Sequence, residues 1–163
     1  MKKNKPLNGL SVIILMAGIV AGCAATSEEQ RFTVRPNLVE AAKINVQLGL
    51  SFLEKNDLPQ SKQKFLQAKQ QAPKEPTVWY GMGYFLERTG DVQKAEAYYQ
   101  KAISLNPQEG AAHNNYGTFL CRQGRYRESL KQFELAVADE NYLDVVGVYR
   151  NVRECAVNKY ANL

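Results

Sequence analysis

Catalysis requires a base, a nucleophile or a metal ion, and few side chains of this chain can supply one. His113 is the only histidine, and no His, Cys or acidic cluster has the spacing of zinc ligands. No Gly-rich phosphate loop follows a strand pattern. The acidic pairs Glu28-Glu29 and Asp139-Glu140 lie in a predicted linker and near a predicted helix end, where solvated charge is the default interpretation. We therefore expect no enzyme, no metal site and no cofactor, and an enzymatic role would have to depend on His113.

Cys23 ends a segment that has the features of a lipoprotein signal. Residues 1–5 are basic, and residues 7–20 are mostly apolar but too few to span a bilayer comfortably. The sequence Val20-Ala21-Gly22-Cys23 resembles the bacterial lipobox, in which small residues fit the signal peptidase and the thiol accepts diacylglycerol. We expect residues 1–22 to be removed and residues 23–37 to form an acylated flexible tether. A plain signal peptide with an incidental cysteine is the alternative.

The acylated chain is expected at the outer membrane. Each buried methylene of an acyl chain contributes roughly 0.8 kcal/mol, so several chains on Cys23 would hold the protein firmly. Residue 24 is Ala, not the Asp that tends to retain lipoproteins at the inner membrane of enteric bacteria. By resemblance to that rule, the protein would face the periplasm from the outer membrane. Losing Lys2, Lys3 and Lys5 reduces the formal charge from +5 to about +2, which argues against nucleic-acid binding.

Three glycines, Gly49, Gly83 and Gly117, recur at an interval of 34 positions and organise most of the chain. A large apolar residue follows each glycine after 16 positions and an alanine after 19 positions: Phe65, Tyr99 and Phe133, then Ala68, Ala102 and Ala136. This period and order are the signature of tetratricopeptide helix pairs. We predict an all-α domain over residues 38–163, a right-handed superhelix of about three and a half repeats: 42–75, 76–109, 110–143 and the half repeat 144–163.

The pattern also predicts individual helices. After a first helix from Leu38 and a second that stops before Pro73, helices are expected over 76–88, 91–105, 110–122, 126–138 and 143–160, with no strand signal. His113 occupies the repeat position of Trp79, which is a packing position, and this favours a structural role for it.

Cys121 and Cys155 are separated by the same interval as the glycines, so they hold the same position in consecutive repeats. In an oxidising compartment these last two thiols are expected to form a disulfide that pins the final helix, contributing ~3 kcal/mol. Neighbouring helix axes lie about 8–10 Å apart, whereas bridged Cα atoms are usually within ~7 Å. The bridge would thus need the last helix to tilt inward, and two free buried thiols are the alternative.

The first helices of the repeats are expected to line a partner-binding groove. Its predicted residues are Val46, Leu50 and Leu53 in the first repeat, Tyr80, Tyr84 and Arg88 in the second, and Asn114, Thr118 and Arg122 in the third. This is an apolar and aromatic trough with a polar rim, unlike the Lys/Asn clamp of tetratricopeptide co-chaperones. An amphipathic helix or an extended apolar segment of a partner suits it better. Ordinary packing is the alternative for some of the tyrosines, Tyr84 among them.

The combination of lipobox, tether and repeats resembles the pilotin lipoproteins of type IV pilus biogenesis, the PilF/PilW family. The stretch from His113 to Cys121 looks like that family's third unit, as do Tyr126, Ser129 and Phe133 after it and Tyr149-Arg150-Asn151 in the fourth. The resemblance implies a protein that helps the outer-membrane secretin reach its membrane and form a ring. Paired cysteines occur in these units of some family members, which supports the Cys121–Cys155 pairing.

The resemblance covers three and a half units, whereas the family usually carries about six. Secretin contacts that the family places on later units are therefore not assigned to this chain. A general periplasm-facing tetratricopeptide lipoprotein that scaffolds cell-envelope enzymes is the alternative function.

Overall fold

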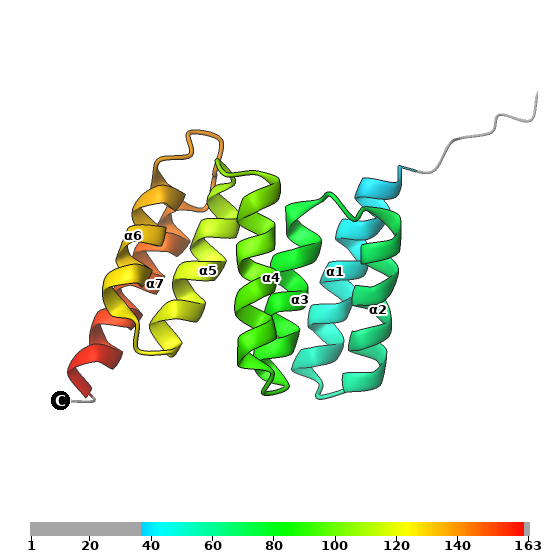
Figure 1. The fold of residues 1–163 in the computed structure, drawn as a ribbon, viewed down its shortest axis with the longest axis horizontal. Coiled ribbons are helices and arrows are strands. Elements are labelled where there is room, and N and C mark those ends of the chain that lie inside the picture. The colour runs from blue at the N-terminus through cyan, green and yellow to red at the C-terminus, as the bar shows by residue number, and fades with distance from the viewer. Residues whose placement is uncertain (1–36, 162–163) are drawn as a thin grey trace, which may run out of the picture. The chain divides into compact units, whose positions relative to one another are not determined.

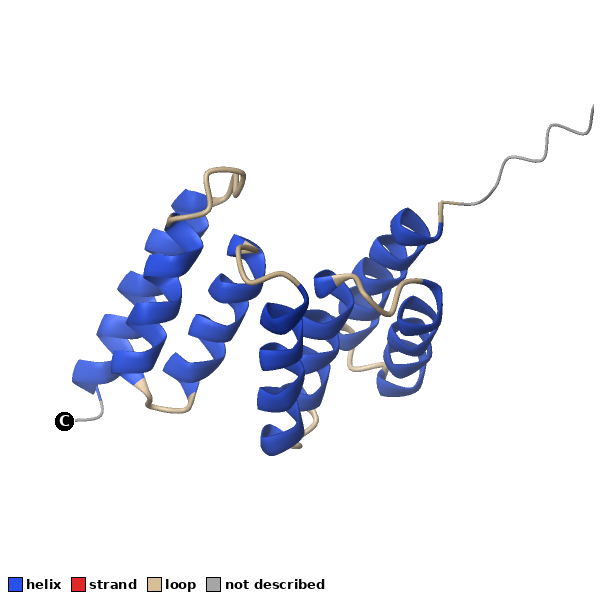
Figure 2. Ribbon diagram, turned by 45° about the horizontal axis from the view of Figure 1, so that its top comes forward, coloured by secondary structure: helices blue, strands red, loops and turns tan. Residues whose placement is uncertain are grey.

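The structure is a computed structural model that describes residues 37–161, so the predicted signal segment and Cys23 lie outside the described part. Seven helices occupy the described residues (Figure 1): α1 (Leu38–Glu54), α2 (Leu58–Gln71), α3 (Pro76–Arg88), α4 (Val92–Leu105), α5 (Gly110–Arg122), α6 (Tyr126–Val137) and α7 (Val145–Ala161). Figure 2 shows helices and loops, with no strand among these residues. The predicted all-α tetratricopeptide fold is confirmed. None of these helices is both long and apolar enough to cross a membrane.

The turns inside the repeats share one geometry because the same position takes a left-handed backbone each time. Asn56, Gly90 and Gly124 have φ of 58°, 89° and 75°. Glycine, and less often asparagine, adopts this conformation at low cost after the end of a helix. In the first two turns the next residue is Asp57 or Asp91, whose carboxylate accepts a hydrogen bond from the backbone N–H of the third residue of the following helix. The local sequence therefore stops one helix and starts the next within a few positions.

The recurring glycines bring the two helices of each repeat into close contact. A Cβ built on Gly117 would lie 2.8 Å from the Phe133 ring, and one on Gly49 would lie 2.9 Å from the Phe65 ring. Ser129 Oγ donates to the Gly117 carbonyl at 2.7 Å, and Ser61 Oγ donates to the Gly49 carbonyl at 2.8 Å. These contacts explain why small residues recur at the same position of each repeat.

The odd-numbered and even-numbered helices form two layers. Helices α1, α3 and α5 each pack against the next odd-numbered helix, whereas the backbones of α2, α4 and α6 approach those of odd-numbered helices alone within residues 37–161. Phe65, Tyr99 and Phe133 are the buried anchors of three successive apolar clusters, each between one repeat and the next. Fully burying such a ring contributes roughly 1.5–3 kcal/mol, so the contacts between repeats carry much of the stability. The layers set which side chains of the odd-numbered helices face outward together.

Candidate partner-binding site

A hollow lies on the layer of odd-numbered helices and draws residues from all four of them. We call it the odd-helix hollow; its volume is about 280 Å³, and its lining comprises Leu50 and Glu54 of α1, Tyr80, Gly81 and Tyr84 of α3, Asn114, Asn115, Thr118 and Arg122 of α5, and Asn151 of α7. Six of the nine predicted groove residues belong to it: Leu50, Tyr80, Tyr84, Asn114, Thr118 and Arg122. The structure thus brings together side chains that lie in four different repeats of the sequence.

Val46 and Leu53 do not line the hollow, and their prediction as groove residues is wrong. They are 2% and 3% exposed and belong to the core around Phe65. Val46 has the repeat position of Tyr80, but its short side chain is covered by α3, where a Cβ on Gly81 would come within 2.9 Å of it. Leu53 precedes by one residue the position that is equivalent to Arg88 and Arg122.

In the first repeat, the residue equivalent to Arg88 and Arg122 is Glu54, which lies one repeat before Arg88 and two repeats before Arg122. Glu54 and Arg122 both line the hollow, so the repeat interval contained the signal that would have found Glu54. Arg88 is exposed at the end of α3 outside the hollow, and its guanidinium donates to the Tyr84 hydroxyl at 2.9 Å. Asn115 and Asn151 were also missed. Asn151 holds the repeat position of the three glycines, and this replacement of a glycine by a polar residue could have identified it from the sequence.

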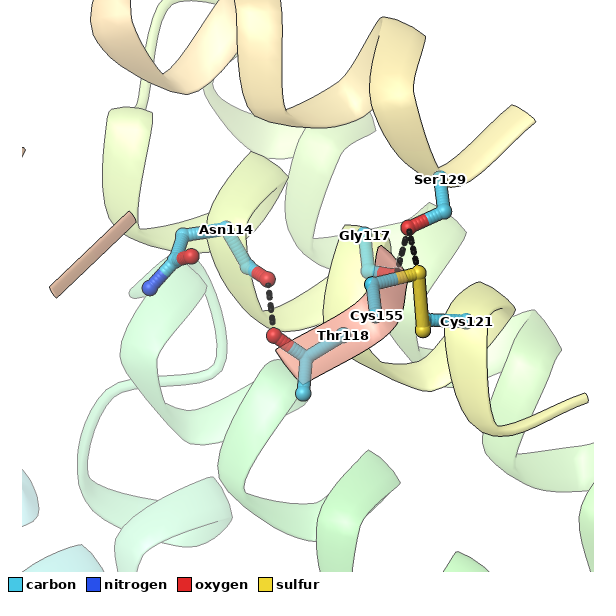
Figure 3. The surroundings of a disulfide bond; sticks show 6 residues. All are labelled: Asn114, Gly117, Thr118, Cys121, Ser129 and Cys155. Atoms are coloured by element: carbon cyan, nitrogen blue, oxygen red, sulfur yellow. Dashed lines mark hydrogen bonds between the residues drawn. A yellow bond between two sulfur atoms is a disulfide. The ribbon is translucent and has the colours of Figure 1, made fainter. Parts of the chain in front are cut away.

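One wall of the hollow is a network of amides and hydroxyls across α5 and α7. Asn114 Nδ2 donates to the Tyr142 hydroxyl at 3.1 Å, and Asn151 Nδ2 donates to Asn114 Oδ1 at 2.9 Å. Thr118 Oγ1 donates to the backbone carbonyl of Asn114 at 2.8 Å, as Figure 3 shows. Asn114 is buried, so these bonds satisfy its amide and fix its orientation. The wall is therefore preorganised and polar, rather than the rim of an apolar trough.

The α3 side of the hollow is aromatic, and two arginines lie near its Tyr84 ring, one in the hollow and one outside it. The guanidinium carbons of Arg88 and Arg122 lie 5.7 and 5.8 Å from the centroid of the Tyr84 ring. Arg122 also donates to Glu87 Oε2 at 2.7 Å, which neutralises its charge. Burial raises the pKa of the Tyr80 phenol, so its hydroxyl stays protonated. A bound segment would therefore meet the ring faces of the tyrosines and an Arg122 guanidinium whose charge is balanced by Glu87.

The polar atoms left for a ligand are mostly acceptors. The Glu54 carboxylate makes no ion pair within the part of the chain described. Asn115 uses its Nδ2 on the Ala111 carbonyl at 2.8 Å, and Asn151 uses its Nδ2 on Asn114. The amide oxygens of Asn115 and Asn151 and the Glu54 carboxylate thus remain to accept hydrogen bonds. The hollow fits a segment that presents N–H donors and an apolar side chain.

A disulfide joins Cys121 of α5 to Cys155 of α7 beside this wall (Figure 3). The two Cα atoms are 5.6 Å apart, and Ser129 Oγ lies 3.6 Å from Cys155 Sγ. The inward tilt expected from the sequence is not required. Cα atoms sit about 2.3 Å from a helix axis, so facing Cα atoms of two helices packed at the usual axis distance already lie within bridging range. The bridge places Asn151 against Asn114 by holding α7 to α5.

His113 is buried, and both of its ring nitrogens have partners. Nε2 lies 2.9 Å from the Pro107 carbonyl, and Nδ1 lies 2.7 Å from Gln132 Oε1. Trp79 Nε1 donates to the Pro73 carbonyl at 2.8 Å in the same repeat position, so His113 Nε2 performs the same structural task one repeat later. Residues 37–161 contain no group of three His, Cys, Asp or Glu side chains able to hold a metal ion.

Comparisons with known proteins agree with this architecture. Two tetratricopeptide-repeat family models match residues 76–109 and residues 98–131. An uncharacterized protein of Haemophilus influenzae is 34% identical over 116 residues, covering 71% of this chain and 65% of that protein. The type IV pilus assembly protein PilF of Pseudomonas aeruginosa is 24% identical over 142 residues, which cover 87% of this chain and 56% of PilF.

Solved structures of the same group are similar in fold. The structure of Pseudomonas aeruginosa PilF matches with a TM-score of 0.66 at 25% identity, over 77% of this chain and 58% of that one. PilW, described as a widely conserved type IV pilus biogenesis factor, matches with a TM-score of 0.64 at 26% identity, over 74% and 55%. The chain thus contains tetratricopeptide repeats, is homologous to PilF, and spans between half and two thirds of the length of these relatives.

Proposed function

We propose that this protein is a non-enzymatic tetratricopeptide lipoprotein of type IV pilus biogenesis that assists assembly of the outer-membrane secretin. The observation that carries the proposal is its homology to PilF over most of the chain, together with the structural likeness to both PilF and PilW. Those relatives are a pilus assembly protein and a pilus biogenesis factor. Tetratricopeptide arrays act by binding segments of other proteins, which agrees with the hollow on the odd-numbered helices.

The proposed location is the periplasmic side of the outer membrane. Its support is the lipobox-like sequence ending at Cys23, followed by Ala24. A lipid at Cys23 would place the repeats close to the membrane in which the secretin ring forms. The secretin segment is proposed to lie in the odd-helix hollow, with its N–H groups toward Asn115, Asn151 and Glu54 and an apolar side chain against Tyr84.

The test is the amount of detergent-resistant secretin multimer in a strain that lacks the gene. We expect secretin monomers to accumulate, and the wild-type gene to restore the multimer. Tyr84→Ala with Asn151→Ala should fail to restore it, because both walls of the hollow lose contacts. The matched control is Tyr149→Ala, which truncates an exposed tyrosine of α7 outside the hollow. Normal multimers in the deletion strain, with capture of cell-wall enzymes instead, would favour the general envelope scaffold.

Lipid attachment is tested separately with Cys23→Ala. This variant should be lost from the outer membrane and leave the secretin at the inner membrane, while a variant with a disrupted hollow should remain in the outer membrane. If Cys23→Ala fractionates like the wild type, the proposed anchor is wrong, but the proposed binding site is not affected.

A further inference from the structure

A second cavity of the described residues lies away from the odd-helix hollow. It occupies about 600 Å³ where the first repeat meets the second, between α2, α4 and the end of α3. We call it the first-junction pocket. Its floor is formed by the buried side chains Phe65, Met82 and Phe85, and exposed Leu58 and Leu66 stand at its edge. It shares no lining residue with the odd-helix hollow.

The next junction along the array, between α4 and α6, is closed by its own polar groups. Arg125 donates to Glu96 at 2.6 Å and to Glu128 at 2.6 Å, so one guanidinium links the two helices. The Tyr116 hydroxyl donates to Glu96 at 2.7 Å and accepts from Gln100 at 3.3 Å. These five side chains satisfy one another across the junction.

In the first junction the equivalent positions, one repeat earlier, carry opposite charges and apolar residues. The positions of Glu96, Arg125 and Glu128 are held in the first junction by Lys62, Asp91 and Lys94, respectively. The positions of Gln100 and Tyr116 are held by Leu66 and Met82. Asp91 pairs with Lys94 at 3.2 Å within α4 and its cap, but no ion pair crosses to α2. Lys62 makes no ion pair in the described part of the chain. Leu66 and Met82 cannot bridge by hydrogen bonds, so the junction stays open, apolar and positively charged at its edge.

We propose that the first-junction pocket binds a segment of another protein that inserts one or two large apolar side chains and sets a carboxylate against Lys62. The size and apolar lining suit such side chains. The charge is complementary, because α2 carries the three lysines Lys62, Lys64 and Lys69 and no acidic residue. The apolar groups of the floor are recessed, so a protruding side chain reaches them, whereas a flat membrane surface does not. This docking surface is independent of the proposed pilus function and of the odd-helix hollow.

The experiment begins with a displayed library of random peptides panned on the full chain in detergent micelles. We expect enriched peptides to combine a large apolar residue with flanking Asp or Glu. The enriched consensus peptide is then labelled, and its fluorescence anisotropy is titrated with the wild type and two variants. Lys62→Glu should weaken binding about five- to tenfold, since it turns an attraction at the pocket edge into a repulsion. Lys64→Glu is the matched control on the same helix outside the pocket and should change binding less than about twofold.

Two further measurements keep the result specific. A peptide whose carboxylates are replaced by Lys should bind Lys62→Glu better than it binds the wild type. Leu66→Gln with Met82→Tyr copies side chains of the second junction and should abolish binding while the helical circular dichroism signal and the melting temperature stay close to wild type.

The proposal is overturned if panning enriches no peptide, if the consensus lacks either the apolar or the acidic residues, or if Lys62→Glu and Lys64→Glu behave alike. It is also overturned if the full chain binds phosphatidylglycerol vesicles in a manner that Lys62→Glu weakens while no peptide is enriched, because the surface then contacts a membrane.

Discussion

The glycine at the helix contact of the third repeat is predicted to be far less tolerant of substitution than its equivalent in the second. Gly117→Ala places a Cβ 2.8 and 2.9 Å from two atoms of the Phe133 ring and 3.2 Å from the Ser129 carbonyl oxygen. Phe133 is 2% exposed, so its ring cannot swing into solvent. In the second repeat, a Cβ on Gly83 meets Tyr99 at 3.2 Å and the Ala95 carbonyl oxygen at 3.3 Å, which calls for a shift of only tenths of an ångström.

Two effects of opposite sign decide the free energy of unfolding. Replacing a helical glycine by alanine favours the helix by up to about 1 kcal/mol, and this gain is common to both variants. Overpacking a tight interior costs roughly 1–3 kcal/mol, and only Gly117→Ala incurs most of it. We expect Gly117→Ala to lower the free energy of unfolding by about 1–2 kcal/mol, and Gly83→Ala to leave it within about 1 kcal/mol of wild type.

The measurement is urea-induced unfolding followed by the helical circular dichroism signal, with equal denaturant slopes required before midpoints are compared. Combining Gly117→Ala with Phe133→Leu should recover part of the loss relative to the sum of the single changes, because the smaller side chain relieves the contact. If Gly117→Ala is as stable as Gly83→Ala, or if the double variant shows no such coupling, then close helix approach is not the reason for these glycines.

Three further outcomes are expected from the same unfolding experiment. Cys155→Ser should lower the free energy of unfolding by about 4 kcal/mol, the loop-closure value for a sequence separation of 34, and reductant should bring the wild type to the same level. The Asp139 carboxylate accepts hydrogen bonds from two backbone N–H groups, which lower its pKa from the ordinary value of an aspartate. Its contribution to stability is therefore present above its unfolded pKa and is lost as the pH falls through the lowered folded pKa, so Asp139→Asn should show a flatter loss of stability from about pH 5 to about pH 2. Arg122→Met leaves the 8%-exposed Glu87 side chain without its cation and should lower the free energy of unfolding by about 1–3 kcal/mol. Arg88→Met, at an exposed position, should lower it by less than about 0.5 kcal/mol. Equal effects of the two variants would contradict the role given to the Arg122–Glu87 ion pair.

Most of the fold followed from the sequence because each repeat is a local unit. The start and end of each helix depend on neighbours only a few positions away, such as Asp57 and Asp91 at the caps and Gly90 and Gly124 in the turns. The repeat interval then identified which side chains were equivalent, and the predicted helix bounds agree closely with the observed ones for α3 to α7.

The composition of the candidate site was only partly accessible from the sequence. Six lining residues were identified from the period, since equivalent positions on the odd-numbered helices face the same side: Leu50, Tyr80, Tyr84, Asn114, Thr118 and Arg122. Val46 was misplaced because a period identifies equivalent positions, not how much of a side chain its neighbour covers.

Tertiary packing alone determined how the repeats complete one another. The contacts of Asn151 with Asn114 and of Arg122 with Glu87 each join one repeat to another, and no local pattern predicts them. The open first junction has the same origin: the Arg125 guanidinium reaches both Glu96 and Glu128, whereas the shorter Asp91 carboxylate at the equivalent position pairs with Lys94 and not with Lys62. The sequence by itself determined the repeated unit, and the structure decided which surfaces those units leave for partners.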